Sequence, residues 1–260
     1  MECMFRLCFI SSSYDCICDF MGKEAGRMRY ELKITLPIYK ILYSIAFMVI
    51  IVLVSPINSF SGIITAVEPN VALLASVFMA DNYYKEYMGE RVAVFYRYPI
   101  RKKYISMLLR TLLSWLYLLL LVAAFYWGFV WWYQPSNFSQ IPIWKMYADT
   151  LAACAASMFF AGVFSFTITN AIQKIGIGIG VTFFLWLVLT STMANVLPQP
   201  VQLFRIIGST SQIGVLEPDY RSRVFYILMG VVLLVLNWLI LQIQPGSNTK
   251  KGWMRYGNKH

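Results

Sequence analysis

Residues 112–125, LLSWLYLLLLVAAF, decide the fold class of this 260-residue chain. The stretch has no charged side chain and no alternation of polar and apolar residues, whereas strands of membrane β-barrels alternate between lipid-facing and lumen-facing positions. It belongs to a longer apolar run, residues 105–132, in which Arg110 is the only charged residue. Because about 20 apolar residues form a helix long enough to cross a bilayer, this run predicts a transmembrane α-helix.

Other apolar runs surround it on both sides. Together the runs cover residues 38–54, 63–80, 105–132, 147–169, 175–196 and 224–243. With 59% hydrophobic and 13% charged residues, the chain is too apolar to bury its nonpolar surface in one soluble core. The predicted fold class is an all-α membrane protein. A six-transmembrane-helix bundle over residues 38–243 follows a cytoplasmic segment, residues 1–37, and precedes a cytoplasmic basic tail, residues 244–260.

The positions of Lys and Arg predict the orientation, because cytoplasmic segments retain positive charge. Most of the 22 Lys and Arg residues lie in residues 1–40, in residues 81–103, at Lys174 or after residue 243. The opposite side carries Lys145, Arg205, Arg221 and Arg223. We therefore predict a multi-pass protein of the cell membrane with both termini cytoplasmic. The net charge of +10 then reports topology, and no nucleic-acid partner is expected because no soluble domain is present to carry a basic patch.

Two segments outside the predicted spans have apolar positions of their own. Residues 22–37 mix basic and apolar side chains before Pro37, which predicts a short helix on the inner membrane surface. A positively charged tether is the alternative. Residues 197–223 are too polar to span and too apolar for a plain loop, so we predict a pair of short re-entrant helices there. A folded external loop is the alternative.

The sequence gives no support for an enzyme active site. No phosphate-binding loop of the G-x-x-x-x-G-K-[ST] type occurs, so the chain is not predicted to bind ATP. His260 is the only histidine and the five cysteines show no C-x-x-C spacing, which argues against zinc binding and against a Ser/His pair. We predict no catalytic, cofactor-binding or metal-binding residues in this chain.

Glu68, followed by Pro69 and Asn70, interrupts the second apolar run. A carboxylate in hydrocarbon costs about 3 kcal/mol on insertion scales, so an acid at that depth faces a cavity or a partner. Glu68 and Asn70 would then belong to a substrate path or a gate. The alternative, which the sequence favours because proline is common at the first helical position, is a span that begins at Pro69 and leaves Glu68 in the external loop. Asn170 and Asn237 are expected to hydrogen-bond between helices.

Small residues at helical spacing predict close packing between spans. Gly176 and Gly180 lie four residues apart, a spacing that lets two membrane helices approach closely. The preceding run has a similar small face at Ala153, Ser157 and Ala161. Helix packing is therefore the predicted role of these five residues.

The segment between the second and third runs, residues 81–104 (DNYYKEYMGERVAVFYRYPIRKKY), is more elaborate than a simple connector. Apolar side chains at residues 88, 92, 95 and 96 have the spacing of one helix face. Gly89 permits a turn after the second run, and Pro99 ends the short helix before a basic cluster anchors the third run. We predict a short helix that docks on a soluble partner. A positive loop with snorkelling side chains is the alternative.

The order of Glu86, Gly89, a short apolar run, Pro99, a basic cluster and Arg110 resembles the permease subunits of type-two ATP-binding-cassette (ABC) exporters. Their cytoplasmic loop typically has an acidic residue, a glycine, a run of leucines, a proline and then a basic residue in the third span. Here Val, Phe and Tyr stand where that family favours leucines. The predicted spans, termini, interfacial helix and re-entrant helices are also similar to that family, so the resemblance covers nearly the whole chain.

The resemblance implies a transport subunit without ATPase activity of its own. ATP and Mg would bind a separate nucleotide-binding subunit. Two permease copies, or this chain with a related one, would export an amphipathic or hydrophobic substrate such as a peptide, an antibiotic or a lipid-linked molecule. The residues implied to couple to the ATPase are Glu86, Gly89, Glu90, Arg91, Val92, Phe95, Arg97, Pro99 and Arg101.

Two other functions remain open from the residues alone. A secondary transporter or channel would use Glu68 and Asn70 as an ion or proton site. A membrane-anchored assembly or sensory protein would not transport at all. Dissipating the proton gradient while supplying ATP separates the first from an ATP-driven exporter, because only the secondary carrier should stop.

Overall fold

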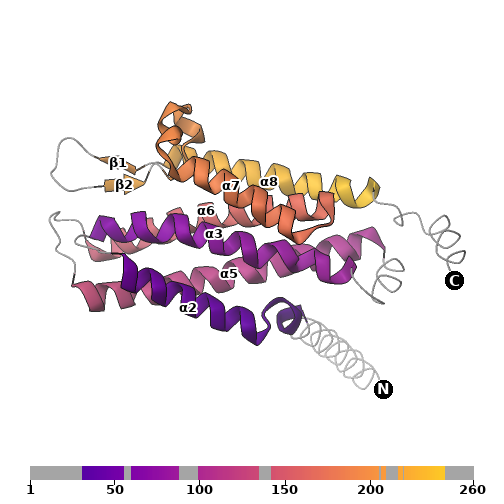
Figure 1. The fold of residues 1–260 in the computed structure, drawn as a ribbon, viewed down its shortest axis with the longest axis horizontal. Coiled ribbons are helices and arrows are strands. Elements are labelled where there is room, and N and C mark those ends of the chain that lie inside the picture. Colours follow the sequence, from indigo (N-terminus) through magenta and orange to yellow (C-terminus); the bar gives the residue numbers. More distant parts are fainter. Residues whose placement is uncertain are drawn as a thin grey trace, which may run out of the picture.

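Long apolar helices lie side by side in the computed structural model (Figure 1). The structure describes residues 31–55, 60–87, 99–134, 142–204, 206–208, 216–218 and 220–243. A helical turn at residues 31–35 leads into the bundle. The helices are α2 (Ile38–Val54), α3 (Phe60–Tyr87), α5 (Ile100–Tyr133), α6 (Ile143–Ile172), α7 (Ile175–Thr190) and α8 (Tyr220–Ile243).

Four of the described helices, α3, α5, α6 and α8, are long and apolar enough to cross a membrane. The other two are shorter: α2 has 17 residues and α7 has 16, which at 1.5 Å per residue gives roughly 25 Å against a hydrocarbon core of about 30 Å. The predicted helical, membrane-like character is thus confirmed. The count of six spans stays a prediction.

Successive helices run in opposite directions along the long axis of the bundle (Figure 1). We call the end where α2 begins and α8 ends the proximal end, and the other the distal end. Pro37, Pro99 and Pro142 each stand directly before a helix, at the N-cap of α2, α5 and α6, where their missing N–H costs no helical hydrogen bond. At the proximal end α6 passes into α7 through only Gln173 and Lys174, and Gln173 adopts a left-handed conformation with φ of 60°.

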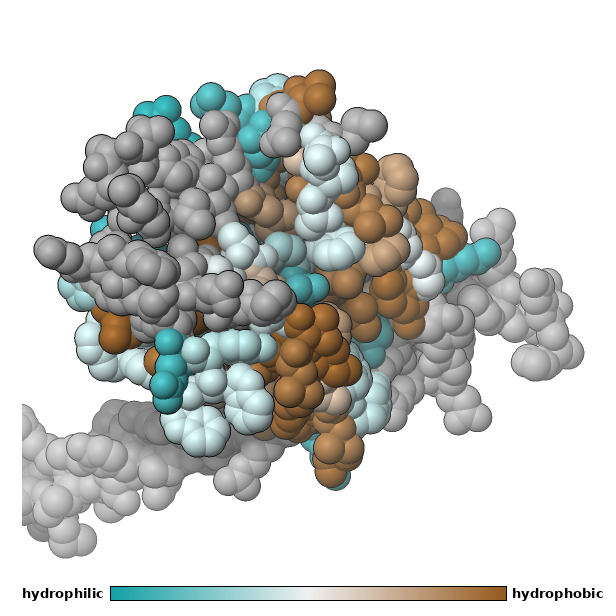
Figure 2. Space-filling model, turned by 60° about the vertical axis from the view of Figure 1, so that its left-hand side comes forward, coloured by the Kyte–Doolittle hydropathy of each residue, from teal (hydrophilic) through white to brown (hydrophobic). Residues whose placement is uncertain are grey.

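The helices α3 and α6 form the centre of the bundle. In their apolar stretches 67% of the residues are buried, against 28% in α5 and 22% in α8. Gly162 on α6 allows a close approach of the two helices, because a Cβ at this position would overlap the side chain of Met79 on α3. The exposed large apolar side chains lie mainly on α2, α5, α7 and α8, and Figure 2 shows such apolar surface on the flank of the molecule. A lipid environment would cover this surface.

The connection between α7 and α8 crosses the distal end. Its described residues form two short 3-10 helices, Thr192–Val196 and Gln199–Val201, and an antiparallel pair of strands, β1 (Ile206–Gly208) and β2 (Leu216–Pro218). This differs from the re-entrant helices predicted over residues 197–223. Prolines at 198 and 200 allow only a single turn there, and the chain then pairs with itself as a ribbon.

Candidate functional site

Glu68 lies inside α3, with 1% of its surface exposed. The favoured prediction, that a helix begins at Pro69 and leaves Glu68 in an external loop, is therefore wrong. The helix runs through Pro69, and two side chains donate to carbonyls around this proline. Asn70 Nδ2 donates to the Ala66 carbonyl at 2.7 Å, and Trp186 Nε1 of α7 donates to the Pro69 carbonyl at 2.8 Å. Pro69 has no N–H to bond the Thr65 carbonyl, and the two side-chain donors add hydrogen bonds next to this interruption.

Both carboxylate oxygens of Glu68 have partners from other helices. Arg223 Nη2 of α8 donates to Oε2 at 2.6 Å, and Ser157 Oγ of α6 donates to Oε1 at 2.6 Å. The side chains of Arg223 and Glu68 are only 3% and 1% exposed. Three helices are thus joined at one buried acid, which has both a counter-charge and hydrogen bonds, as burial of a charge requires. We call Glu68, Ser157 and Arg223 the distal ion-pair site.

The sequence did not identify Arg223 as part of a site. We assigned it to the external segment as a topology signal, but α8 begins at Tyr220 and buries Arg223 at its first turn. One feature of the sequence could have linked the two residues. Glu68 and Arg223 both lie near the external start of an apolar run, so both are expected at a similar depth in the membrane. Asn70, predicted to share a path with Glu68, instead uses its amide within its own helix.

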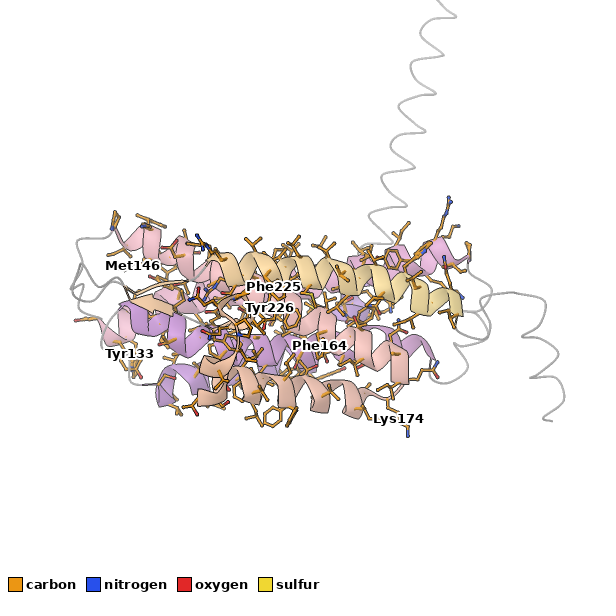
Figure 3. The ribbon with its side chains drawn as sticks, turned by 90° about the horizontal axis from the view of Figure 1, so that it is seen from above. Tyr133, Met146, Phe164, Lys174, Phe225 and Tyr226 are labelled. Carbon is orange, nitrogen blue, oxygen red and sulfur yellow. The ribbon has the colours of Figure 1, made fainter. Side chains whose placement is uncertain are left out.

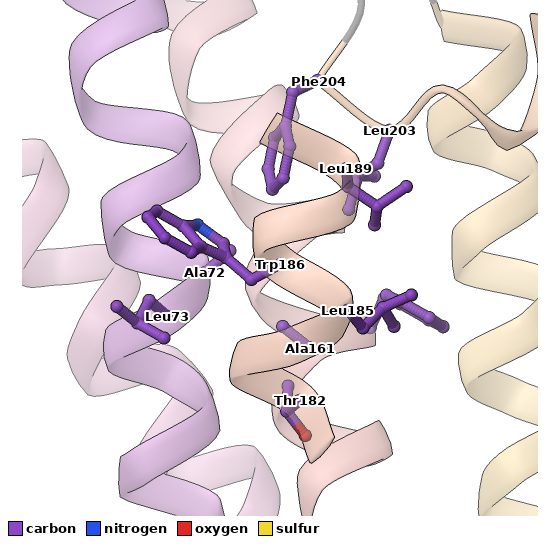
Figure 4. Close-up of a pocket in the computed structure, with 10 residues that line it drawn as sticks. Ala72, Leu73, Ala161, Thr182, Leu185, Trp186, Leu189, Leu203 and Phe204 are labelled. Atoms are coloured by element: carbon purple, nitrogen blue, oxygen red, sulfur yellow. The ribbon is translucent and has the colours of Figure 1, made fainter. Parts of the chain in front are cut away.

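An open depression of about 790 Å³ lies at the distal end above this site. Pro69 contributes to it, and uncharged side chains such as Thr190, Ser191, Gln199 and Gln202 line it. Below it, a small apolar cavity of about 20 Å³ lies between α3, α6 and α7 (Figure 4). A space of that size holds about one water molecule. The side chain of Trp186 lies between α7 and α3 in Figure 4 and forms part of the wall of this small cavity. Its ring therefore helps to keep the cavity beneath the depression small.

A second group of buried charges lies at the proximal end. Arg110 Nε donates to Glu31 Oε2 at 2.5 Å, and Ser106 Oγ donates to Glu31 Oε1 at 2.6 Å. These bonds fix the turn at residues 31–35 against α5. Lys40 Nζ of α2 donates to Asp81 Oδ1 at 2.5 Å and to the Phe78 carbonyl at 2.9 Å. The N-terminal turn, α2, α3 and α5 are therefore tied together at this end.

The structure describes only part of the predicted coupling segment, residues 81–104. Since α3 continues to Tyr87, residues 81–87 belong to that helix rather than to a loop. Glu86 lies in its last turn, Pro99 is the N-cap of α5, and Arg101 is exposed in the first turn of α5. The other predicted coupling residues lie outside the described residues: Gly89, Glu90, Arg91, Val92, Phe95 and Arg97.

Of the two helix faces of small residues predicted to pack against other helices, one is buried in the structure and the other is exposed. On α6, Ala153, Ser157 and Ala161 are buried, and Ser157 reaches Glu68 on α3. On α7, Gly176 and Gly180 are exposed, and a Cβ built on either has no neighbour within 4 Å. The close contact is instead at Gly178, where a Cβ would overlap the Thr169 side chain and lie 2.9 Å from the Ser165 carbonyl. Residues two apart on a helix point in nearly opposite directions, which explains the difference.

The predicted interhelical hydrogen bonding of Asn170 and Asn237 is confirmed, and the two residues are partners of each other. Asn170 Nδ2 of α6 donates to Asn237 Oδ1 of α8 at 3.0 Å, and Asn237 Nδ2 donates to Thr167 Oγ1 at 2.6 Å. Figure 3 shows Phe225 and Tyr226 of α8 near Phe164 of α6, and these residues belong to one apolar cluster. The hydrogen-bond network holds the proximal half of α8, as the distal ion-pair site holds its first turn.

Replacing Asn237 with alanine should weaken the proximal attachment of α8. Interhelical hydrogen bonds in membranes contribute about 0.6 kcal/mol each, and up to about 2 kcal/mol. With two interhelical bonds lost, we expect a decrease of about 1–2 kcal/mol in the free energy of unfolding, measured by denaturant titration of the purified protein in detergent. Leu236→Ala, which shortens an exposed neighbour, serves as the control. An equal loss in both variants would contradict the assignment.

Two further sources of information, groups of metal-ligating side chains and similarity to known proteins, do not indicate what the site binds. Within the part of the chain that the structure describes, no three His, Cys, Asp or Glu side chains are grouped so that they could hold a metal ion. No protein-family model, no curated protein and no solved structure matches this chain. Function therefore has to be inferred from the residues and their geometry.

Proposed function

We propose that this chain is the transmembrane permease subunit of an ABC exporter. A separate nucleotide-binding subunit would bind ATP and Mg, and a second copy of the chain or a related permease would complete the pathway. In this proposal six helices cross the cell membrane, the proximal end faces the cytoplasm, and both termini lie on that side. The substrate would be amphipathic or hydrophobic, such as a peptide, an antibiotic or a lipid-linked molecule.

The observation that carries this proposal is the bracing of the proximal end. The segment predicted to meet the ATPase connects α3 to α5, and Arg110 near the start of α5 also donates to the Asn82 carbonyl near the end of α3 at 3.3 Å. Lys40 ties α2 to the same turn of α3. A push on residues 88–98 would therefore move α2, α3 and α5 together rather than bend one helix alone. Such rigidity is what an energy-coupling element requires.

The helix order supports the proposed topology. Successive helices alternate in direction, so α3 ends and α5 begins at the proximal end, where α6 also passes into α7, and α7 ends and α8 begins at the distal end (Figure 1). The exposed Lys33, Arg101, Lys102 and Lys174 lie at the proximal end, and positive charge is retained on the cytoplasmic side.

The distal depression supports an export role. It opens on the side that the proposal places outside the cell, and its lining combines hydroxyl and amide groups with Leu197 and Phe204. Such a surface suits an uncharged amphipathic molecule leaving the bundle. The narrow space at Trp186 would represent a closed state of the pathway.

The test is purification of the tagged chain from the membranes of its own cells, followed by identification of the bound proteins by mass spectrometry. We expect a nucleotide-binding ATPase to copurify. The double charge reversal Glu90→Lys with Arg91→Glu should lower the recovered ATPase at least about tenfold, because reversed charges at an interface cost several kcal/mol. Lys145→Glu on the distal side is the control and should leave recovery unchanged. Undiminished recovery with the double reversal, or absence of any ATPase partner, would contradict the coupling proposal.

A further inference from the structure

We infer that the proximal end carries a docking surface for the headgroups of anionic phospholipids. The surface consists of Lys33 on the turn 31–35 and of Arg101 and Lys102 in the first turn of α5; all three are exposed. We call these residues the proximal basic surface. The inference rests on the membrane placement of the bundle and not on the ATPase partnership.

Buried contacts hold both parts of this surface at the proximal end. Glu31 binds Ser106 and Arg110 of α5, so the turn that carries Lys33 is fixed against that helix. Along the axis of α5, Arg101 and Lys102 precede Ser106 by about 6–8 Å at 1.5 Å per residue. All three basic side chains are exposed at this end of the bundle, where one layer of headgroups would meet them.

The same ion pairs engage the acids whose side chains the structure describes at this end. Glu31 and Asp81 are engaged with Arg110 and Lys40, and their side chains are only 8% and 15% exposed. Among the side chains that the structure describes, no acid is exposed at the proximal end. The first turn of α5 also has no acidic residue, so the positive end of its dipole adds to the charge of Arg101 and Lys102. An external anion would relieve this repulsion.

Aromatic residues beside the surface indicate the level of the headgroups. Tyr104 donates its hydroxyl to the Leu234 carbonyl at 3.1 Å, and its ring meets Trp238 with centroids 5.0 Å apart. Tyr39 at the start of α2 is 54% exposed. Tyr and Trp concentrate at the boundary between hydrocarbon and headgroups. Arg101 and Lys102, closer to the helix start than Tyr104, would extend into the phosphate layer, where each basic residue strengthens binding about fivefold.

The experiment counts lipids bound to the purified full-length chain by native mass spectrometry. Phosphatidylglycerol and phosphatidylcholine with identical acyl chains are supplied in equal amounts. We expect the wild-type protein to retain phosphatidylglycerol preferentially. The triple variant Lys33→Gln, Arg101→Gln and Lys102→Gln should lose this preference by at least about tenfold, given about fivefold for each residue. Added salt should weaken the preference as well.

The control is the double variant Lys145→Gln with Arg221→Gln, which removes two exposed cations at the distal end. It should keep the wild-type preference. Unfolding in phosphatidylcholine micelles verifies that both variants are folded. An unchanged preference in the triple variant, or an equal loss in the distal control, would overturn the inference. Competition by soluble glycerol phosphate as strong as that by the lipid would also overturn it, because the surface would then recognise free phosphate. None of these results depends on an ATPase, so they are separable from the proposed function.

Discussion

Replacing Arg223 with alanine is expected to lower the free energy of unfolding by about 3–5 kcal/mol. The change leaves the Glu68 carboxylate buried between α3 and α6 with only Ser157 as a described partner. An isolated charge at this depth is far more costly than a lost surface ion pair, which contributes about 1 kcal/mol or less. Chemical denaturation of the purified chain in detergent, followed by tryptophan fluorescence, measures the loss.

Two further variants make this prediction specific. Arg221→Ala removes a similar side chain two positions earlier, where it is exposed, and should cost less than about 1 kcal/mol. Glu68→Gln combined with Arg223→Met removes both charges and keeps a hydrogen-bond acceptor for Ser157. This double variant should be more stable than Arg223→Ala alone, because it has no uncompensated charge. If Arg221→Ala is as harmful as Arg223→Ala, or if the double variant shows no recovery, the buried pair does not hold α8 as described.

Replacing Gly178 with valine is expected to separate α7 from α6 and to destabilise the bundle by up to about 3 kcal/mol. The first added carbon would overlap Thr169 and lie 2.9 Å from the Ser165 carbonyl. A backbone carbonyl inside a helix cannot move aside as a flexible side chain can. Thermal unfolding in detergent and disulfide crosslinking between cysteines introduced on α6 and α7 would measure the effect.

Gly180→Val is the matched control for this prediction. It makes the same chemical change two residues along the same helix, where a Cβ has nothing within 4 Å. Its cost should be near zero within this chain. If Gly176 and Gly180 pack against a second copy of the chain, Gly180→Val should lower the dimer fraction while leaving the monomer stable. Equal destabilisation by both variants would contradict the assignment of the α6–α7 contact to Gly178.

The sequence predicted the helices better than their contacts. Apolar runs indicate where helices lie, because lipid and the bundle core both demand apolar side chains. They do not show which face of a run meets another helix, so the spacing of Gly176 and Gly180 does not reveal that Gly178 makes the contact. The ribbon at the distal end was also missed, since strands of three residues leave no periodic pattern.

The candidate site was missed for a different reason. The sequence indicates that Glu68 is of interest, but the rule that proline begins helices places it outside α3, whereas the helix runs through Pro69 and is contacted there by Trp186 of α7. Arg223 is 155 positions from Glu68 in the chain, and no local pattern links the two. Each residue looked like an ordinary helix terminus by itself; the pair becomes evident only when α3 and α8 are placed side by side.

The connection of α6 to α7 through Gln173 and Lys174 has a consequence for biogenesis. In the proposed six-span arrangement, two residues are too few to hold α7 outside the bilayer while α6 inserts, so the two helices would enter the membrane as one hairpin. Within that hairpin the short α7 is shielded from the start by α6, its partner through Gly178. An error in the pairing of α6 and α7 would then arise during insertion, before α8 has been synthesised.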